Sequence, residues 1–329
     1  MKNQEKEFLS VKDLVVEYTS EDTVIHAVNG VSFSLEKGHV LGLVGETGAG
    51  KTTIAKSILR VLPDMSARVV GGEIRLESEE LLTKPEKEME KIRGKKISMI
   101  FQDPMTALNP TQTIGAQIAE VISTHNKISK AEAQTRAMQM LEMVGIKADR
   151  YQDYPFQLSG GMKQRVVIAI ALACDPELLL ADEPTTALDV TIQAQVLDMI
   201  RNLKKEMGTS LILITHDLGV VGEMCDEVAV VYAGQIIESG TKWDIFDHPS
   251  HPYTVGLFHA LPDISKKTDR LSPIDGLPPD PSALPDGCSF HPRCPYAEDK
   301  CRQGEMPTVE VSAGHFCKCC RCGIVNEEV

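Results

Sequence analysis

A glycine-rich segment that ends in a lysine and a threonine is the strongest chemical signal in the sequence. Residues 45–52 read GETGAGKT, which fits the pattern G-x-x-x-x-G-K-[ST]. The segment follows an apolar run of strand length and precedes a helical pattern. Glycines allow backbone angles that turn several N–H groups toward a phosphate, and the helix start adds the positive end of its dipole. The segment therefore predicts a phosphate-binding loop for a nucleotide.

The side chains of this loop have separate expected tasks. Lys51 is expected to hold the β- and γ-phosphates of ATP, and Thr52 to ligate Mg²⁺. A glycine-rich turn with a chance lysine is the alternative, which the strand-loop-helix context makes weak. The residues expected to line the nucleotide here are Gly45, Glu46, Thr47, Gly48, Ala49, Gly50, Lys51, Thr52 and Thr53.

Two carboxylates follow a second apolar run. Residues 178–183 read LLLADE, as in a Walker B strand that ends in acidic residues. The carboxyl end of a parallel strand borders the ligand crevice, where Asp182 can bind Mg²⁺ and Glu183 can orient or deprotonate an attacking water. An acidic strand-to-turn junction without chemistry is the alternative, and the upstream phosphate-binding loop argues against it.

A serine and two glycines precede a third helical run. Residues 158–165 read LSGGMKQR and lead into the apolar stretch 166–174. Ser159 is a good N-cap, and the glycine pair leaves the helix start open to a phosphate. A capped helix without a ligand is the alternative. With this segment the sequence resembles the ATP-binding cassette (ABC) family, whose signature motif has this form with Met162 where glutamine is commoner.

The resemblance implies an α/β fold. The expected core is a P-loop NTPase (RecA-like) parallel sheet, with an antiparallel β subdomain, a helical signature subdomain at about 103–175 and a Cys-rich C-terminal extension. The apolar runs at 178–182 and 210–217 agree with a sheet buried on both faces. The composition changes to Pro, Gly, Asp and Cys after about residue 262. The expected domains are therefore a nucleotide-binding domain, 1–262, and an extension, 263–329.

The resemblance also assigns the signature helix to a second subunit's nucleotide. In this family the start of that helix faces the ATP held by the opposite cassette, so the chain is expected to work as half of a dimer. The residues expected to contact that ATP are Ser159, Gly160, Gly161 and Gln164.

Three further positions take roles from the family. Gln102 matches the glutamine that reaches the metal and the attacking water, and His216 matches the switch histidine that contacts the γ-phosphate. Tyr18 resembles the aromatic residue that stacks on adenine. The expected Mg²⁺ ligands are Thr52, Gln102 and Asp182. The expected catalytic set is Glu183, His216, Gln102 and Lys51.

Two strings, QDPMTALNPTQTIG and HPYTVGLFHALP, resemble the peptide/nickel importer group of the family, and most closely its D-type ATP-binding subunit. The resemblance implies an ATP-hydrolysing, energy-coupling subunit of a dipeptide or oligopeptide importer. The implied partners are a second ABC ATPase subunit of the paralogous F type, two transmembrane permease subunits and an extracytoplasmic substrate-binding protein. Nickel or another small solute is the alternative cargo.

Charge and hydropathy limit the binding partners and the location that are expected for the protein. Acidic residues outnumber basic ones by 47 to 34, so the chain is a poor partner for nucleic acid. A non-transport ABC ATPase acting on DNA or the ribosome is the alternative of a different class, and this charge argues against it. The sequence has no apolar run of about 18 to 20 residues and no signal-peptide pattern. We expect a peripheral protein at the cytoplasmic face of the plasma membrane.

Seven of the nine cysteines lie between residues 288 and 322. In a reducing cytosol this density favours a metal or cluster site over disulfides. Four thiolates can hold a [4Fe–4S] cluster, and the set lacks the paired C-x₂-C knuckles usual for zinc. The spacing resembles the cluster-bearing extension of peptide importer ATPases, so a [4Fe–4S] cluster is expected, with zinc or unligated thiols as alternatives. The expected ligands are Cys288, Cys294, Cys301 and Cys317.

Overall fold

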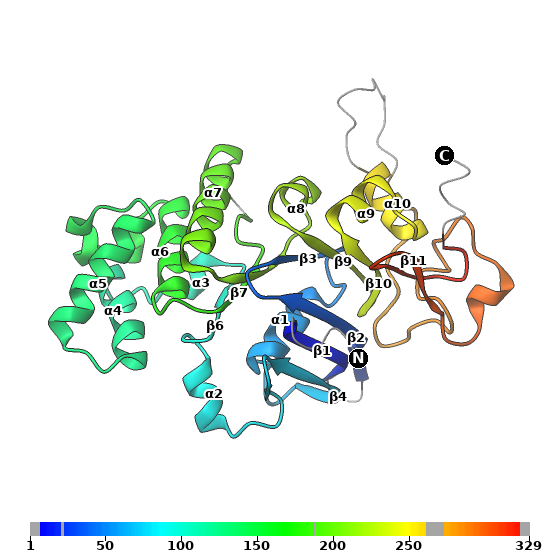
Figure 1. The fold of residues 1–329 in the computed structure, drawn as a ribbon, viewed down its shortest axis with the longest axis horizontal. Helices are drawn as coiled ribbons and strands as arrows, with labels where there is room; N and C mark the ends of the chain where they lie inside the picture. Colours follow the sequence, from blue (N-terminus) through cyan, green and yellow to red (C-terminus); the bar gives the residue numbers. More distant parts are fainter. Residues whose placement is uncertain (1–6, 21–22, 187, 261–272, 323–329) are drawn as a thin grey trace. The chain divides into compact units, whose positions relative to one another are not determined.

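The chain forms two compact units in the computed structural model (Figure 1), which describes residues 7–20, 23–186, 188–260 and 273–322. The first unit takes its residues from 1–35, 41–82 and 215–329, and the second from 36–40 and 83–214. The predicted domain boundary at residues 262 and 263 lies outside the described residues.

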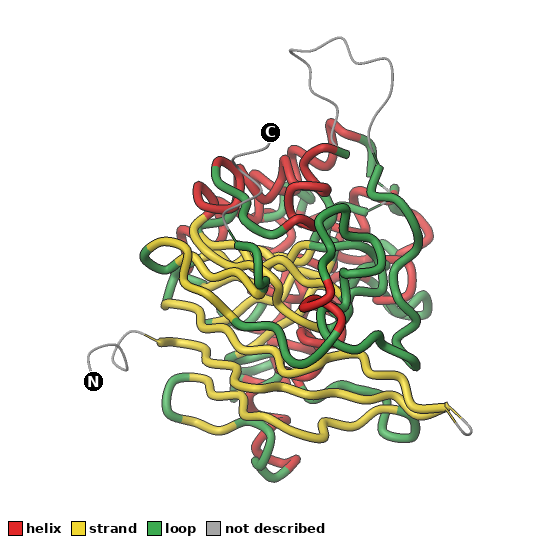
Figure 2. Tube along the Cα trace, turned by 90° about the vertical axis from the view of Figure 1, so that its right-hand side faces the viewer, coloured by secondary structure: helices red, strands yellow, loops and turns green. Residues whose placement is uncertain are grey.

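A four-stranded sheet opens the first unit. Its strand order is β2 (Thr23–Glu36), β1 (Glu7–Ser20), β4 (Ala67–Leu76) and β5 (Glu79–Glu80). β1 pairs antiparallel with β4, with Leu9 opposite Leu76. β1 and β2 have 14 residues each, and strands are yellow in Figure 2.

β4 continues through two adjacent glycines, Gly71 and Gly72. Gly72 has a φ of 97°, and a Cβ there would lie 2.6 Å from the carbonyl oxygen of Asp13 in β1. The pairing of β1 with β4 shifts register between Lys12 and Val15. A glycine with positive φ inside a paired strand makes a β-bulge instead of reversing the chain.

The first unit also holds strands in the order β11 (Thr308–Ser312), β12 (His315–Lys318), β10 (Gln235–Thr241), β9 (Glu227–Tyr232) and β3 (Val40–Val44). β3 and β9 are parallel, and the other pairs are antiparallel. Its helices are α1 (Lys51–Leu59), α8 (Leu218–Met224), α9 (Lys242–Asp247), α10 (Pro252–His259) and the 3₁₀ turn η3 (Asp299–Arg302).

Parallel strands form the centre of the second unit, in the order β8 (Ser210–Ile214), β7 (Leu178–Asp182) and β6 (Ile97–Ile100). Every residue of these strands is buried, as a sheet covered on both faces requires. α7 (Val190–Met207) connects β7 to β8 in a βαβ unit.

The described elements between β6 and β7 are all helical, and in Figure 1 their colours run from cyan at α3 to green at α5 and α6. They are α3 (Pro104–Ala107), α4 (Ile114–His125), α5 (Lys130–Met143), η1 (Ala148–Gln152), η2 (Pro155–Gln157) and α6 (Gly160–Leu172). This segment carries the signature motif. The helix α2 (Glu86–Ile92) precedes β6 in the chain.

A strand and a buried charge attach the C-terminal extension to the first unit. β12 pairs with β10, with Cys317 opposite Glu238. The Nε2 atom of His315 lies 2.8 Å from Oε1 of Glu238, and both side chains are at most 1% exposed. The Glu238 carboxylate also accepts hydrogen bonds from the backbone N–H groups of Ser250, at 2.6 Å, and His251, at 2.9 Å. Glu238 therefore joins β10, β12 and the start of α10.

We expect Glu238→Ala to lower the free energy of unfolding by about 3 kcal/mol, because it leaves buried donors without their acceptor. Urea unfolding followed by circular dichroism measures the change. Glu305→Ala is the control, since Glu305 belongs to the same extension but its side chain is 91% exposed. Equal stability of the two variants would show that the buried carboxylate does not hold the extension.

Candidate functional site

The phosphate-binding loop, residues 45–52, connects β3 to α1. Gly45, Gly48 and Gly50 have φ angles of 147°, 83° and 103°. A Cβ at Gly45 would lie 2.1 Å from the carbonyl oxygen of Val231, and one at Gly50 would lie 2.4 Å from that of Ala27. No side chain of the described residues caps the start of α1. The loop thus has the backbone shape and the open helix start that a phosphate site needs.

Lys51 lies inside the loop that is expected to bind phosphate. Its side chain is buried, and Nζ donates hydrogen bonds to the carbonyl oxygens of Gly45, at 2.7 Å, and Glu46, at 2.8 Å. The hydroxyl of Tyr18 lies 3.3 Å from Oγ1 of Thr53, so the predicted adenine-stacking residue adjoins the helix that follows the loop. His216 is exposed in the same unit, and its contact with the γ-phosphate stays a prediction.

The second unit brings two predicted catalytic residues together at the carboxyl ends of β6 and β7. Nε2 of Gln102 donates to Oε2 of Glu183 at 2.9 Å. The hydroxyl of Thr186 donates to the same oxygen at 2.8 Å. The sequence reasoning missed Thr186, although its position three residues after Glu183 in the turn EPTT was a usable signal. Two neutral donors therefore orient the Glu183 carboxylate.

The signature residues Ser159, Gly160 and Gly161 differ in their hydrogen bonds and in the space around them. The hydroxyl of Ser159 accepts a hydrogen bond from the N–H of Met162 at 3.4 Å, as predicted for an N-cap. Space is open around Gly160, but a Cβ at Gly161 would lie 2.7 Å from Cγ2 of Ile192 in α7. Gly160 is thus the position where a ligand can approach the helix start closely, and Gly161 permits helix packing.

Gln164 is buried, and its Nε2 donates to the carbonyl oxygen of Pro184 at 2.5 Å. Pro184 directly follows Glu183, so this bond ties the signature helix to the turn that carries the predicted catalytic carboxylate. The predicted contact of Gln164 with ATP stays a prediction.

The donor chemistry suits Mg²⁺. Thr52, Gln102 and Asp182 supply a hydroxyl, an amide carbonyl and a carboxylate, which are the hard oxygen ligands that this ion prefers. Asp182 ends β7 with 2% of its surface exposed. Each of these donor types therefore fits the ion that accompanies ATP.

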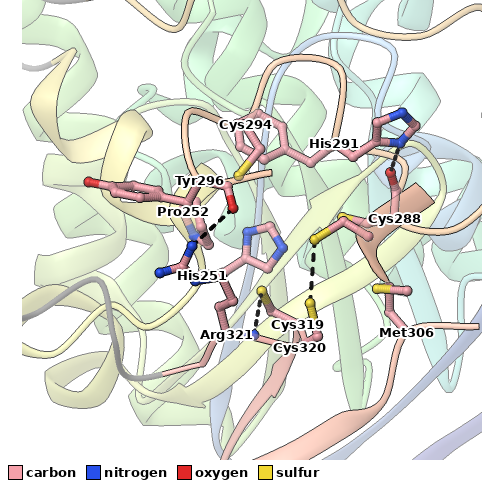
Figure 3. A pocket seen from close by; sticks show the side chains of 12 residues that line it. His251, Pro252, Cys288, His291, Cys294, Tyr296, Met306, Cys319, Cys320 and Arg321 are labelled. Atoms are coloured by element: carbon pink, nitrogen blue, oxygen red, sulfur yellow. Dashed lines mark hydrogen bonds between the residues drawn. The ribbon is translucent and has the colours of Figure 1, made fainter. Parts of the chain in front are cut away.

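The predicted iron–sulfur cluster and the zinc alternative are both wrong for the extension. Among the described residues, no group of three or more His, Cys, Asp or Glu side chains is arranged to hold a metal ion. Cys317, a predicted ligand, lies in β12 with no exposed surface, outside the small cavity that contains the other three. Figure 3 shows that cavity, whose cysteines are Cys288, Cys294, Cys301, Cys319 and Cys320.

Burial acts on the pKa of two of the cavity cysteines. Burial raises the pKa of Cys294 to about 11 and also raises the pKa of Cys288. Sγ of Cys301 lies 3.4 Å from Sγ of Cys320, a hydrogen-bond contact between thiols.

No helix among the described parts of the chain combines the length and the apolar character needed to cross a membrane.

Comparisons with known proteins agree with the motifs. The family model "ABC transporter" matches residues 28–186, and the model "Oligopeptide/dipeptide transporter, C-terminal region" matches residues 237–301. The dipeptide transport ATP-binding protein DppD of Bacillus subtilis is 51% identical over 289 residues, which are 87% of this chain and 86% of that protein. The oligopeptide transport ATP-binding protein OppD of the same bacterium is 49% identical over 313 residues, with 94% and 87% covered.

A solved structure is similar to the cassette part of the chain. The ATP-binding cassette MJ0796, in a dimeric post-hydrolysis state bound to ADP and Pi, matches with a TM-score of 0.65 and 26% identity, covering 71% of this chain and 98% of that one. Fold and motifs together define an ATP-binding cassette ATPase. The chain belongs to the ABC transporter family, in the group of ATP-binding subunits with the oligopeptide/dipeptide C-terminal region. The predicted family and the predicted ATPase class are confirmed.

We expect Gly45→Ala to weaken ATP binding far more than Gly48→Ala. Both glycines have positive φ, which costs an alanine about 1 kcal/mol. A Cβ at Gly45 also collides with Val231, whereas one at Gly48 meets nothing within 4 Å. Calorimetric titration of each full-length variant with ATP, with melting temperatures alongside, measures the difference. Equal losses in both would show that close approach to β9 does not shape the loop.

Proposed function

We propose that the chain hydrolyses ATP to drive the import of dipeptides or oligopeptides. The observation that carries the proposal is the pairing of two matched regions in one chain, an ABC ATPase region and the oligopeptide/dipeptide C-terminal region. Relatives that cover most of the chain are named for dipeptide and oligopeptide transport. Nickel, the alternative cargo, and a non-transport role have no comparable support.

The hydrolytic step follows from the charges of the named residues. Lys51 and the N–H groups of the phosphate-binding loop hold the β- and γ-phosphates. Mg²⁺, when bound, neutralises phosphate charge, and Thr52, Gln102 and Asp182 would hold it. Glu183 accepts the proton of the attacking water while Gln102 and Thr186 keep its carboxylate oriented.

The assembly follows from the signature helix. The open approach at Gly160 supports a phosphate contact from outside the unit, which a second cassette would supply. The proposed second cassette is a paralogous F-type subunit. Permeases and a substrate-binding protein follow from the transporter group, and the chain would act at the cytoplasmic face of the plasma membrane. ATP-driven closure and reopening of the cassettes would move the permease helices.

Transport by the reconstituted complex tests this function. The chain is purified with its second cassette and permeases, placed in proteoliposomes with the binding protein, and supplied with a labelled dipeptide, a labelled oligopeptide or Ni²⁺. ATP-dependent uptake of peptide is the expected result. Uptake of Ni²⁺ without peptide would replace the proposed cargo and retain the ATPase.

We expect Glu183→Gln to retain ATP binding and to slow hydrolysis at its site by about 10²-fold or more, because glutamine cannot accept the proton. The measurement is phosphate release by the assembled transporter, with ATP affinity determined in parallel. Glu177→Gln is the matched control, since Glu177 directly precedes β7 at its other end and forms a 3.2 Å ion pair with Lys37. Normal turnover in Glu183→Gln would remove Glu183 from the catalytic role.

A further inference from the structure

We propose that Arg293 in the C-terminal extension is a positioning residue for the phosphate-binding loop: it holds the loop through Glu46 and neutralises that carboxylate beside the phosphate site. The inference rests on the proposed function of the loop as an ATP site. It gives the extension a direct part in nucleotide binding.

The contact is a bidentate ion pair. Nη1 of Arg293 lies 2.7 Å from Oε2 of Glu46, and Nη2 lies 3.0 Å from Oε1. The Arg293 side chain is 4% exposed and that of Glu46 is 29% exposed. Two parallel charge-assisted bonds fix both distance and orientation, and this burial protects the pair from solvent screening.

The extension and β9 hold the guanidinium in place. Its Nε donates to the carbonyl oxygen of Asp275 at 3.0 Å, and Nη2 donates to that of Ile274 at 3.3 Å. Nη1 also lies 3.4 Å from the hydroxyl oxygen of Tyr232, the last residue of β9. The charge on Arg293 is therefore anchored by neighbours that do not belong to the loop.

A second group from the C-terminal half holds the backbone of the same loop residue. The hydroxyl of Tyr253, in α10, accepts a hydrogen bond from the N–H of Glu46 at 2.9 Å. The Tyr253 ring packs against Tyr232 and Phe290, with centroids 4.6 and 5.4 Å away. Phe290 is a buried residue of the extension. Glu46 is thus held at its backbone and at its side chain by one connected cluster.

The sign of the charge makes this contact relevant to ATP. The carbonyl oxygen of Glu46 lies 2.8 Å from Nζ of Lys51, the residue expected to hold the β- and γ-phosphates. A carboxylate on that residue repels an incoming triphosphate unless a cation cancels it. Arg293 supplies that cation. Removal of the arginine would leave an uncompensated negative charge on Glu46, within the phosphate-binding loop.

A double-mutant cycle tests the inference on the full-length chain. The variants are Arg293→Gln, Glu46→Gln and the double variant, and ATP affinity is measured by calorimetry at low and high salt. We expect Arg293→Gln to weaken ATP binding about three- to tenfold, with a smaller loss at high salt. In the Glu46→Gln background the same arginine change should alter the affinity by less than about twofold, because no charge remains to be neutralised.

The outcomes separate electrostatic positioning from a folding role. An arginine that only stabilises the extension would cause the same loss of affinity in both backgrounds, and that result would overturn the proposal. Arg293→Lys keeps the charge without the bidentate geometry, so an affinity between wild type and Arg293→Gln is expected. Should Arg293→Gln unfold, Arg293→Lys measured with and without Glu46→Gln provides the same cycle, and equal losses there would again overturn it.

A further variant separates this inference from the proposed function. Lys51→Ala removes the phosphate-binding side chain. A wild-type chain that bound ATP no better than Lys51→Ala would overturn the ATP site itself. If Arg293→Gln binds ATP with wild-type affinity while Lys51→Ala loses ATP binding, the role of Arg293 alone is overturned.

Discussion

The close approach of the phosphate-binding loop to β9 is the constraint on which the first unit depends. Gly45 turns directly over the carbonyl oxygen of Val231, where a larger residue would collide with the strand. The next residue of β9, Tyr232, packs against Tyr253 and Phe290 and lies beside Arg293. One strand end therefore supports the loop on one side and the extension on the other. A change in that packing would reach the loop without altering any phosphate ligand.

Local motifs made part of this arrangement predictable from sequence. GETGAGKT, LLLADE and LSGGM each encode their chemistry within a few residues, and the strand at 178–182 has the predicted bounds. The hairpin of β11 and β12 was not predicted, because every residue of β11 is exposed and β12 pairs with β10, distant in the sequence. The contact of Arg293 with Glu46 joins residues 247 positions apart, beyond the reach of any spacing argument.

The cysteines show why spacing alone misled. Four cysteines in a short segment resembled a ligand set, but spacing does not reveal the direction of a side chain. Cys317 is fixed by strand pairing between β10 and β11, and its position follows from that register and not from the other cysteines. The extension also has other sources of stability, namely the Glu238 and His315 contact and the buried ring of Phe290. A metal ion is therefore not needed to explain why this segment folds.

Glu183 and Glu46 differ in the charge of their hydrogen-bond partners, and this difference suits their different proposed roles. In its proposed role as the general base, Glu183 must keep a basic carboxylate, and two of the donors that orient it, Gln102 and Thr186, are neutral. Glu46 must not repel the triphosphate, and its partner Arg293 carries a full positive charge. A neutral donor fixes direction and leaves the charge, whereas a guanidinium fixes direction and cancels it. For the roles proposed above, an exchange of these partners would weaken the base at Glu183 and leave an anion at the phosphate-binding loop.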